Sequence, residues 1–192
     1  MKKAFCFLMV ILLLPIYAAA ETKFIERPFD ISCDIFLEYL QLTMGNEVDD
    51  QKTYISQGIY LETETSSILI MKDDTPVFPR VRGLGVSVQP SKYEHPSDCA
   101  VSLTADAISV YRAVTQCKSN DIKELYDTFL SLGIIDSTIN ETPINSIYTI
   151  YEDCLISLSA DYESDLIQYV IMKNPFVEKP KFKEFENTNE GE

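Results

Sequence analysis

The sequence has no tryptophan and a single histidine, His95, among its 192 residues. One histidine leaves the usual zinc sites short of ligands, unless carboxylates supply most of them. The hydrolase signatures G-x-S-x-G, S-x-x-K and H-E-x-x-H are also missing, as is a phosphate-binding glycine loop. We therefore expect no catalytic, metal-binding or cofactor-binding site, and we predict that the chain is not an enzyme.

His95 lies four residues before Cys99, which raises the question of a cysteine nucleophile with a neighbouring base. Such a nucleophile needs a thiolate held close to the base. We expect Cys99 to be oxidised instead, because it is one of an even number of cysteines in a chain that we expect to be exported. Pro96 favours a loop, so we interpret residues 93–100 as a surface loop that leads into a disulfide-anchored strand.

Positive charge is scarce, since 16 lysines and arginines stand against 30 aspartates and glutamates, for a formal net charge of −14. Nucleic-acid phosphates repel such a chain, and its few arginines cannot form a basic face. The same charge disfavours anionic membrane surfaces. The sequence therefore predicts no nucleic-acid partner, and it favours a basic protein as the partner.

The first twenty residues have the pattern of a cleaved signal peptide. Two lysines precede an apolar run over residues 4–14, and three alanines at 18–20 offer a cleavage site. The run is shorter than the about 20 apolar residues that span a membrane. We expect residues 1–20 to be removed, which changes the net charge from −14 to −16, and no membrane insertion afterwards. The expected location is the bacterial periplasm, or secretion, with a eukaryotic secreted protein left open.

Four cysteines follow the predicted signal peptide, at Cys33, Cys99, Cys117 and Cys154. An even number in an exported chain indicates two disulfides, for which three connectivities exist. Because no C-x-x-C sequence occurs, nothing suggests a redox motif or a zinc knuckle. We favour the pairs Cys99–Cys117 and Cys33–Cys154.

The rest of the chain predicts one disulfide-stapled α+β domain over residues 21–174, followed by a mobile tail at 175–192. Apolar residues at helical spacing, with end signals, predict two main helices at 30–45 and 119–133. β-Branched and aromatic residues predict antiparallel strands after each helix, including a three-strand meander after the second. This order is compatible with a tandem of two α-β-β-β units.

Two stretches are open to more than one interpretation. Residues 100–114 predict a hairpin that turns at 104–106, and the alternative is a helix that starts after Thr104. Gly83 and Gly85 form a lone G-x-G within a predicted strand, where a bulge or a close backbone approach explains them better than a nucleotide.

Residues 161–165 carry carboxylates at alternate positions, as the first part of a calcium-binding loop does. Leu166, however, stands where such a loop needs glycine. We therefore interpret this segment as a turn with solvated charges.

An acidic exported domain without a catalytic set is best interpreted as a binding protein. We expect an inhibitor or immunity protein that occludes a basic enzyme or toxin, since negative charge steers basic partners toward it. The alternative is a structural or assembly factor of the bacterial envelope, and the third is a small-ligand carrier or a hydrolase. The candidate partner-binding residues are Glu47, Asp49, Asp50, Asp73, Asp74 and Tyr93.

A structure can discriminate between these functions. An assembly factor would expose an unpaired edge strand or an apolar patch. An enzyme would hold carboxylates of perturbed pKa in a concave pocket. The sequence does not define the oligomeric state.

Overall fold

A computed structural model describes residues 27–44, 52–116 and 122–176. The described helices are α2 Cys33–Met44, α3 Pro96–Thr115, α4 Ile122–Leu130 and α5 Ile134–Asn140, with a 3-10 helix at Pro90–Lys92. The described strands are β1 Lys52–Ile55, β2 Gly58–Glu62, β3 Ser67–Lys72, β4 Val81–Val88, β5 Ile144–Tyr151, β6 Cys154–Asp161 and β7 Leu166–Lys173. None of these helices is long and apolar enough to cross a membrane.

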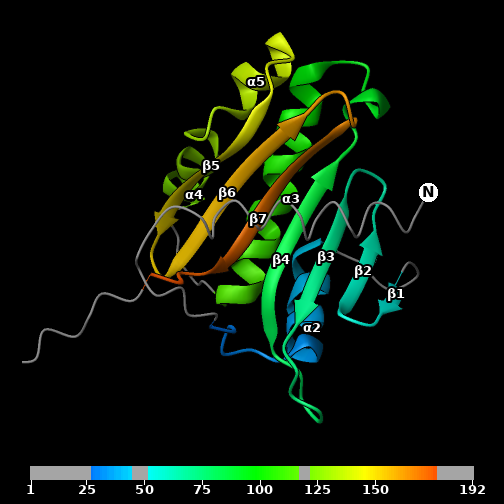
Figure 1. Ribbon diagram of the computed structural model, residues 1–192, viewed down its shortest axis with the longest axis vertical. Coiled ribbons are helices and arrows are strands. Elements are labelled where there is room, and N and C mark those ends of the chain that lie inside the picture. Colours follow the sequence, from blue (N-terminus) through cyan, green and yellow to red (C-terminus); the bar gives the residue numbers. More distant parts are fainter. Residues whose placement is uncertain (1–26, 45–51, 117–121, 177–192) are drawn as a thin grey trace, which may run out of the picture. The chain divides into compact units, whose positions relative to one another are not determined.

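The seven strands form one antiparallel sheet in the order β1-β2-β3-β4-β7-β6-β5 (Figure 1). Strands β1 to β4 form one meander and β5 to β7 form another, so the last strands of the two meanders pair at the centre. Their register runs from Gly83 opposite Met172 to Val88 opposite Ile167. The predicted α+β class with an antiparallel sheet is confirmed. A helix precedes each meander, as in the predicted tandem, although the first meander has four strands instead of three.

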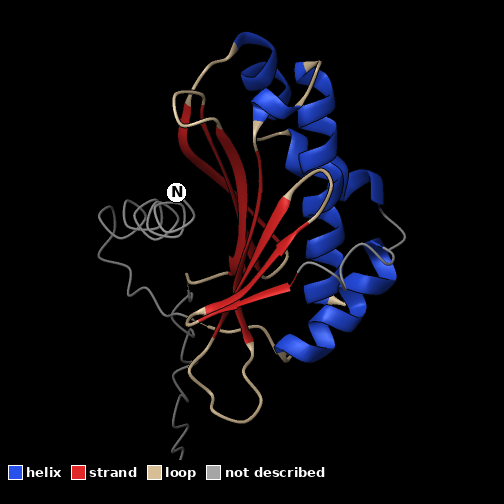
Figure 2. Ribbon diagram, turned by 90° about the vertical axis from the view of Figure 1, so that its right-hand side faces the viewer, coloured by secondary structure: helices blue, strands red, loops and turns tan. Residues whose placement is uncertain are grey.

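The helices lie on one face of the sheet (Figure 2), and the hydrophobic core fills the space between. Alternate residues of a strand point to the same face. One such set on the central strands is buried against the helices, and its members are Leu84, Val86, Ile156, Leu158, Ile167, Tyr169 and Ile171. The long helix α3 packs on both β4 and β7, so it spans the junction of the two meanders.

Residues 96–115 form helix α3, so the predicted hairpin turning at 104–106 is wrong. Pro96 occupies the first helical position, where its fixed φ and its missing N–H are tolerated. Buried residues recur every three or four positions, at Cys99, Leu103, Ala107, Val110 and Val114. The strand propensity of the valines is overridden because this helical spacing places them together on the core face.

The two helices predicted from end signals are confirmed within a few residues. Ser32 lies just before α2, and its hydroxyl accepts the backbone N–H of Ile35 at 3.3 Å, as a capping side chain does. Gly133 separates α4 from α5 with a left-handed φ of 81°, a conformation that costs glycine little. Helix α5, directly after this glycine, was not predicted.

The structure has no bond between Cys33 and Cys154, so it does not support this predicted pairing or a disulfide-stapled fold. Both side chains are buried and free, one at the start of α2 and the other at the start of β6. Each fills core space as a small apolar side chain does. Cys99 is buried and free as well, and its predicted partner Cys117 lies outside the described residues. The described part of the fold is thus held together by its core and not by disulfides.

The three buried thiols should be unreactive in the folded protein. Burial raises the pKa of Cys33 and of Cys99 to about 11 and that of Cys154 to about 12, and the thiolate is the reactive form. We expect iodoacetamide at neutral pH to label none of them before unfolding in guanidinium and all of them afterwards. Peptide mass spectrometry without prior reduction checks this, and a linked Cys33–Cys154 peptide would contradict the free thiols.

Tyr169 on the central strand β7 should contribute to stability through its hydroxyl. Its ring meets the ring of Phe129 edge to face at 5.0 Å, and its hydroxyl donates to the Phe129 carbonyl at 3.0 Å. The substitution Tyr169→Phe removes one of two donors to that carbonyl, which keeps the N–H of Leu132 at 3.4 Å. We therefore expect the free energy of unfolding to fall by about 1 kcal/mol in urea denaturation. The matched control is Tyr162→Phe, which removes a less buried hydroxyl and should cost less.

Candidate functional site

Strand β5 forms one edge of the sheet, because among the described residues it pairs only with β6. Its sequence INSIYTIY contains no charged residue and no proline, and the exposed fractions of Ile147, Tyr148 and Ile150 are 41%, 54% and 45%. Natural edge strands are usually short, or carry charges or proline that discourage further pairing. The opposite edge strand, β1, has four residues including Lys52. Strand β5 has none of these protections in its own sequence.

The turn between β5 and β6 determines which backbone groups of β5 face outward. This turn has two residues, 152–153. In such a hairpin the flanking residues, here Tyr151 and Cys154, form a hydrogen-bonded pair, and hydrogen-bonded pairs alternate along the strands. The backbone N–H and C=O groups of Tyr148 and Ile150 therefore point away from β6.

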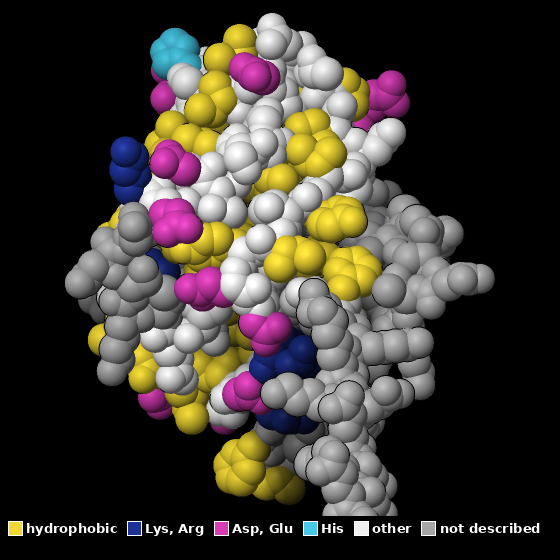
Figure 3. Space-filling view, turned by 90° about the vertical axis from the view of Figure 1, so that its left-hand side faces the viewer, with side chains coloured by type: hydrophobic (Ala, Val, Ile, Leu, Met, Phe, Trp, Pro, Cys, Tyr) yellow, Lys and Arg dark blue, Asp and Glu magenta, His cyan; other side chains and the backbone are white. Residues whose placement is uncertain are grey.

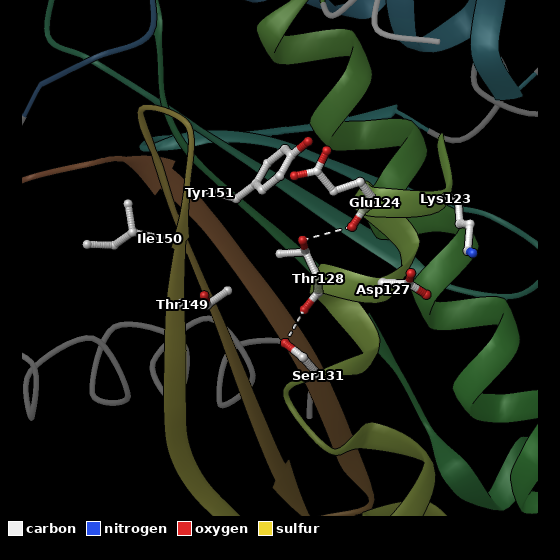
Figure 4. Close-up of a pocket in the computed structure, with 8 residues that line it drawn as sticks. All are labelled: Lys123, Glu124, Asp127, Thr128, Ser131, Thr149, Ile150 and Tyr151. Carbon is white, nitrogen blue, oxygen red and sulfur yellow. Dashed lines mark hydrogen bonds between the residues drawn. The ribbon is translucent and has the colours of Figure 1, made fainter. Parts of the chain in front are cut away.

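A groove of about 530 Å³ lies between β5 and α4 (Figure 4). It is lined by Lys123, Glu124, Asp127, Thr128 and Ser131 of α4 and by Thr149, Ile150 and Tyr151 of β5. Figure 4 shows Glu124 and Tyr151 pointing toward each other, whereas Ile150 points away from α4. A strand added to β5 would therefore lie beside this groove and could place side chains in it.

The hydroxyl groups on the α4 side of the groove are hydrogen-bond acceptors toward a ligand. Thr128 Oγ1 donates to the Glu124 carbonyl at 2.8 Å, and Ser131 Oγ donates to the Thr128 carbonyl at 2.7 Å (Figure 4). Since a hydroxyl has one hydrogen, these two can offer a ligand only their lone pairs. The Glu124 carboxylate is an acceptor as well. This wall of the groove thus offers acceptors at Glu124, Thr128 and Ser131 and donors at Lys123.

On the sheet face opposite the helices, three rows of cross-strand partners carry no charged side chain. Their members are Ser67, Leu69, Met71, Gly83, Gly85, Ser87, Leu155, Ser157, Ser159, Gln168, Val170, Met172, Tyr148 and Ile150. Charges on this face lie outside these rows, at Asp161 near the end of β6 and at Glu62 on β2. Tyr148 and Ile150 bring this face to the β5 edge, and Figure 3 shows hydrophobic side chains gathered on the side of the molecule where β5 lies.

For the two strand glycines we predicted a bulge or a close backbone approach, and the structure shows a register irregularity and a close side-chain approach at Gly83. The register between β3 and β4 shifts at Met71 and Lys72, opposite Gly83. A Cβ atom at Gly83 would lie 2.7 Å from the terminal methyl carbon of Met71, closer than such atoms pack. Glycine at this position therefore lets the Met71 side chain lie over the backbone of β4.

The described structure does not bring the predicted partner-binding residues together. The acids within 47–50 lie outside the described residues. Asp73 and Asp74 directly follow β3, whereas the Tyr93 hydroxyl donates at 2.6 Å to the carbonyl of Thr65, just before β3. Asp73 and Tyr93 are therefore at opposite ends of this strand and do not form one surface.

Asp73 has a structural role in the loop between β3 and β4. Its carboxylate accepts the backbone N–H groups of Thr75 at 3.2 Å and Arg80 at 2.8 Å, and it pairs with the Arg80 guanidinium at 3.1 Å. Burial opposes ionisation of this carboxyl, but the hydrogen bonds outweigh burial and lower the pKa of Asp73. The charge of Asp73 is thus used within the loop.

His95 and Cys99 do not form a nucleophile with its base. His95 precedes the first turn of α3, where its carbonyl accepts the N–H of Cys99 at 3.4 Å. Cys99 is 1% exposed, and burial raises its pKa to about 11, so the thiol is protonated at neutral pH. In segment 161–165 the Asp161 carboxylate accepts N–H groups of its own turn. No group of three or more metal-ligating side chains occurs among the residues that the structure describes.

A second, smaller cavity of about 280 Å³ lies beside the turn between β5 and β6. Its charged groups are engaged with one another, since the Lys173 ammonium lies 2.6 Å from the Asp30 carboxylate and 3.9 Å from that of Asp153. The hydrogen bond from Lys173 lowers the pKa of Asp30. We therefore assign this cavity a structural role, in joining the chain before α2 to the end of β7.

The loop role of Asp73 predicts a pH-dependent contribution to stability. Its pKa is lower in the folded chain than in the unfolded chain, so its stabilisation is present above the unfolded pKa and is lost as pH falls through the folded value. We expect Asp73→Asn to lower the free energy of unfolding by about 1 kcal/mol at neutral pH and to have little effect below the folded pKa. Urea denaturation as a function of pH checks this, with Asp74→Asn as the control, and equal losses at all pH values would contradict it.

Comparison of the chain with protein families, with curated proteins and with solved structures finds no match. The function of this chain must therefore be inferred from its own geometry. The feature that combines exposure, backbone hydrogen-bonding capacity and a neighbouring groove is the β5 edge.

Proposed function

We propose that this chain is an exported protein-binding module that takes an extended segment of a partner protein onto β5 as an additional strand. The observation that carries this proposal is the unprotected edge, eight residues long and without charge or proline. Strand addition supplies affinity through main-chain hydrogen bonds and specificity through pockets for alternate side chains. The groove beside α4 is such a pocket.

This geometry favours the assembly-factor function over the inhibitor or immunity function. An exposed edge strand is the feature that we expected of a structural or assembly factor of the envelope. The inhibitor proposal relied on a group of acids and Tyr93, and the described members of that group are dispersed. Inhibition of a basic enzyme or toxin is the second candidate function, which the net charge of −14 supports.

We further propose that the chain acts without catalysis or a cofactor, in the periplasm or after secretion, following removal of residues 1–20. These proposals rest on the N-terminal lysines, the apolar run and the alanine site. The expected partner is a protein, since strand addition requires a peptide backbone on the other side.

Removal of one outward N–H group of β5 should weaken partner binding. The variant Ile150→Pro lacks a donor that faces the unpaired side, and proline is tolerated at such edge positions, so the β5–β6 ladder should persist. We expect peptides selected from a random library against the wild-type chain to bind this variant about ten-fold more weakly, because at least one main-chain hydrogen bond is lost. Fluorescence anisotropy measures the affinity.

The matched control is Ile150→Thr, which keeps the N–H group and the β-branched shape. Circular dichroism establishes that both variants fold, and Tyr148→Pro replaces Ile150→Pro if the latter does not. Amide hydrogen exchange should show protection of Tyr148 and Ile150 when peptide is bound. Undiminished binding by a folded proline variant would contradict strand addition at this edge.

A further inference from the structure

We infer that the solvent-facing side of α2, with the tip of the loop between β3 and β4, docks on a second protein whose surface is apolar at its centre and basic at its border. This inference concerns a surface other than β5 and does not rest on the proposed strand addition. It follows from a helix that is apolar on two sides, of which the fold buries one.

Helix α2 has apolar side chains on both of its sides. The side toward the core has four buried members, which are Cys33, Phe36, Leu37 and Leu40. The other side carries Ile35, Tyr39 and Leu42. At 3.6 residues per turn, spacings of four and three residues place these three side chains in one stripe, away from the buried set. The packing of α2 on α3 and on the core therefore uses one side of the helix.

The stripe of Ile35, Tyr39 and Leu42 is open to solvent. The exposed fractions of the three side chains are 46%, 39% and 81%. Apolar residues that are exposed singly are normal on protein surfaces, whereas a contiguous set of them marks an interaction site. Apolar residues at positions i, i+4 and i+7 of a helix are the anchors that fit the apolar groove of a partner protein. The stripe therefore indicates docking of α2 against such a groove.

The loop between β3 and β4 adds two exposed apolar residues at the same end of the molecule. Val77 and Phe78 have exposed fractions of 73% and 68%. The backbone N–H of Cys33, the first residue of α2, donates to the carbonyl of Pro79 at 2.8 Å. This hydrogen bond attaches the loop to the first turn of the helix, so the loop tip and the start of the stripe lie at one end of the chain's fold (Figure 1).

The charges of α2 beside the stripe are negative. Asp34 and Glu38 lie on adjacent turns, each directly before a residue of the stripe, and the helix contains no lysine or arginine. A partner that buries the stripe brings its own border next to these carboxylates, where basic side chains are attracted and acidic ones are repelled. The net charge of −14 extends this attraction to longer range.

The loop side of the surface has charges of both signs in equal number. Asp73 and Arg80 pair with each other at 3.1 Å. Lys72 at the end of β3 and Asp74 in the loop contribute one charge of each sign. The two acids of α2 therefore determine the charge that a partner meets, and they favour a basic border.

The same charges disfavour two other occupants. Helices that lie on membrane surfaces carry lysine and arginine beside their apolar face, and α2 carries neither. A second copy of this chain would bring two acidic helices together, and α2 has no basic side chain to offset their repulsion. A basic protein is thus the occupant that matches both the apolar stripe and its border.

The test uses three fluorescent helical peptides and the chain that begins at Glu21. The first peptide has a stripe of leucines bordered by lysines, the second has glutamates in place of the lysines, and the third has the composition of the first with its leucines spread around the helix. We expect the first to bind most tightly and the second at least about ten-fold more weakly. The third should also bind more weakly, and equal affinity for the first and third peptides would overturn the inference because charge alone would then suffice. Anisotropy at low salt measures the three affinities.

Two pairs of variants locate the binding surface, with circular dichroism to establish that each variant folds. Leu42→Gln should weaken binding of the first peptide about ten-fold, because leucine burial is lost. Its control Ile139→Gln, a 58% exposed position on α5, should have little effect. Glu38→Gln should weaken binding about three-fold, as expected for a partly exposed ion pair. Its charge-matched control Glu64→Gln lies between β2 and β3, at the opposite end of β3 from the loop, and should have a smaller effect. Equal losses within either pair would overturn docking at α2.

Two measurements on the free protein test the other occupants. Sedimentation that shows a dimer, converted to a monomer by Leu42→Gln, would make a second copy the occupant and overturn the partner inferred here. Flotation with phosphatidylcholine vesicles that Leu42→Gln abolishes would make a lipid surface the occupant and overturn it as well. We expect a monomer that does not float with the vesicles.

Discussion

The antiparallel pairing of β4 with β7 is the contact on which the rest of this structure depends. It joins two meanders that would each be small sheets with an unprotected central edge. The pairing aligns Leu84 with Ile171 and Val86 with Tyr169, and these fully buried residues provide the surface on which the long helix α3 packs. A sheet of three or four strands is stable only with a hydrophobic face or with a helix packed on it. Here the two meanders share one hydrophobic core beneath the same helices.

This pairing also determines which strands become edges. Because the last strand of each meander lies at the centre, the chain of each meander must have begun at the outside, at β1 and at β5. The first of these edges is short and carries Lys52, whereas the second is long and uncharged. The two edges of the sheet therefore differ in length and in charge.

The chemistry beside β5 comes from the combination of a strand with a helix. Helix α4 buries Leu125 and Phe129 in the core, which turns the adjacent polar stripe with Thr128 toward β5. The helix backbone then uses the hydroxyl hydrogen of Thr128, so this hydroxyl presents only its lone pairs to the groove. The groove thus combines hydroxyl lone pairs with the charged side chains of Lys123, Glu124 and Asp127.

Local patterns predicted several of these elements. Capping residues and apolar spacing were sufficient for α2 and α4, and alternation with short turns was sufficient for the meander of β5, β6 and β7, because these signals act within a few residues. The same kind of signal failed for α3, where β-branched residues suggested strands although their positions at Val110 and Val114 fit a helical face. Cysteine counting failed in the same way, because an even number does not tell whether Cys33 and Cys154 approach each other.

The sequence by itself thus determined the class of the fold, the acidity of the surface and the strand-forming character of residues 144–151. Only the tertiary structure decided that these residues form an edge, that α4 lies beside them, and that Asp73 and Tyr93 are far apart. The physical reason is that edge position and groove formation depend on pairing between residues distant in the chain, such as Val86 with Tyr169. The absence of charge from residues 144–151 was visible in the sequence. It did not show whether the strand lies at the centre of the sheet or at its edge, because strands in both positions can be uncharged.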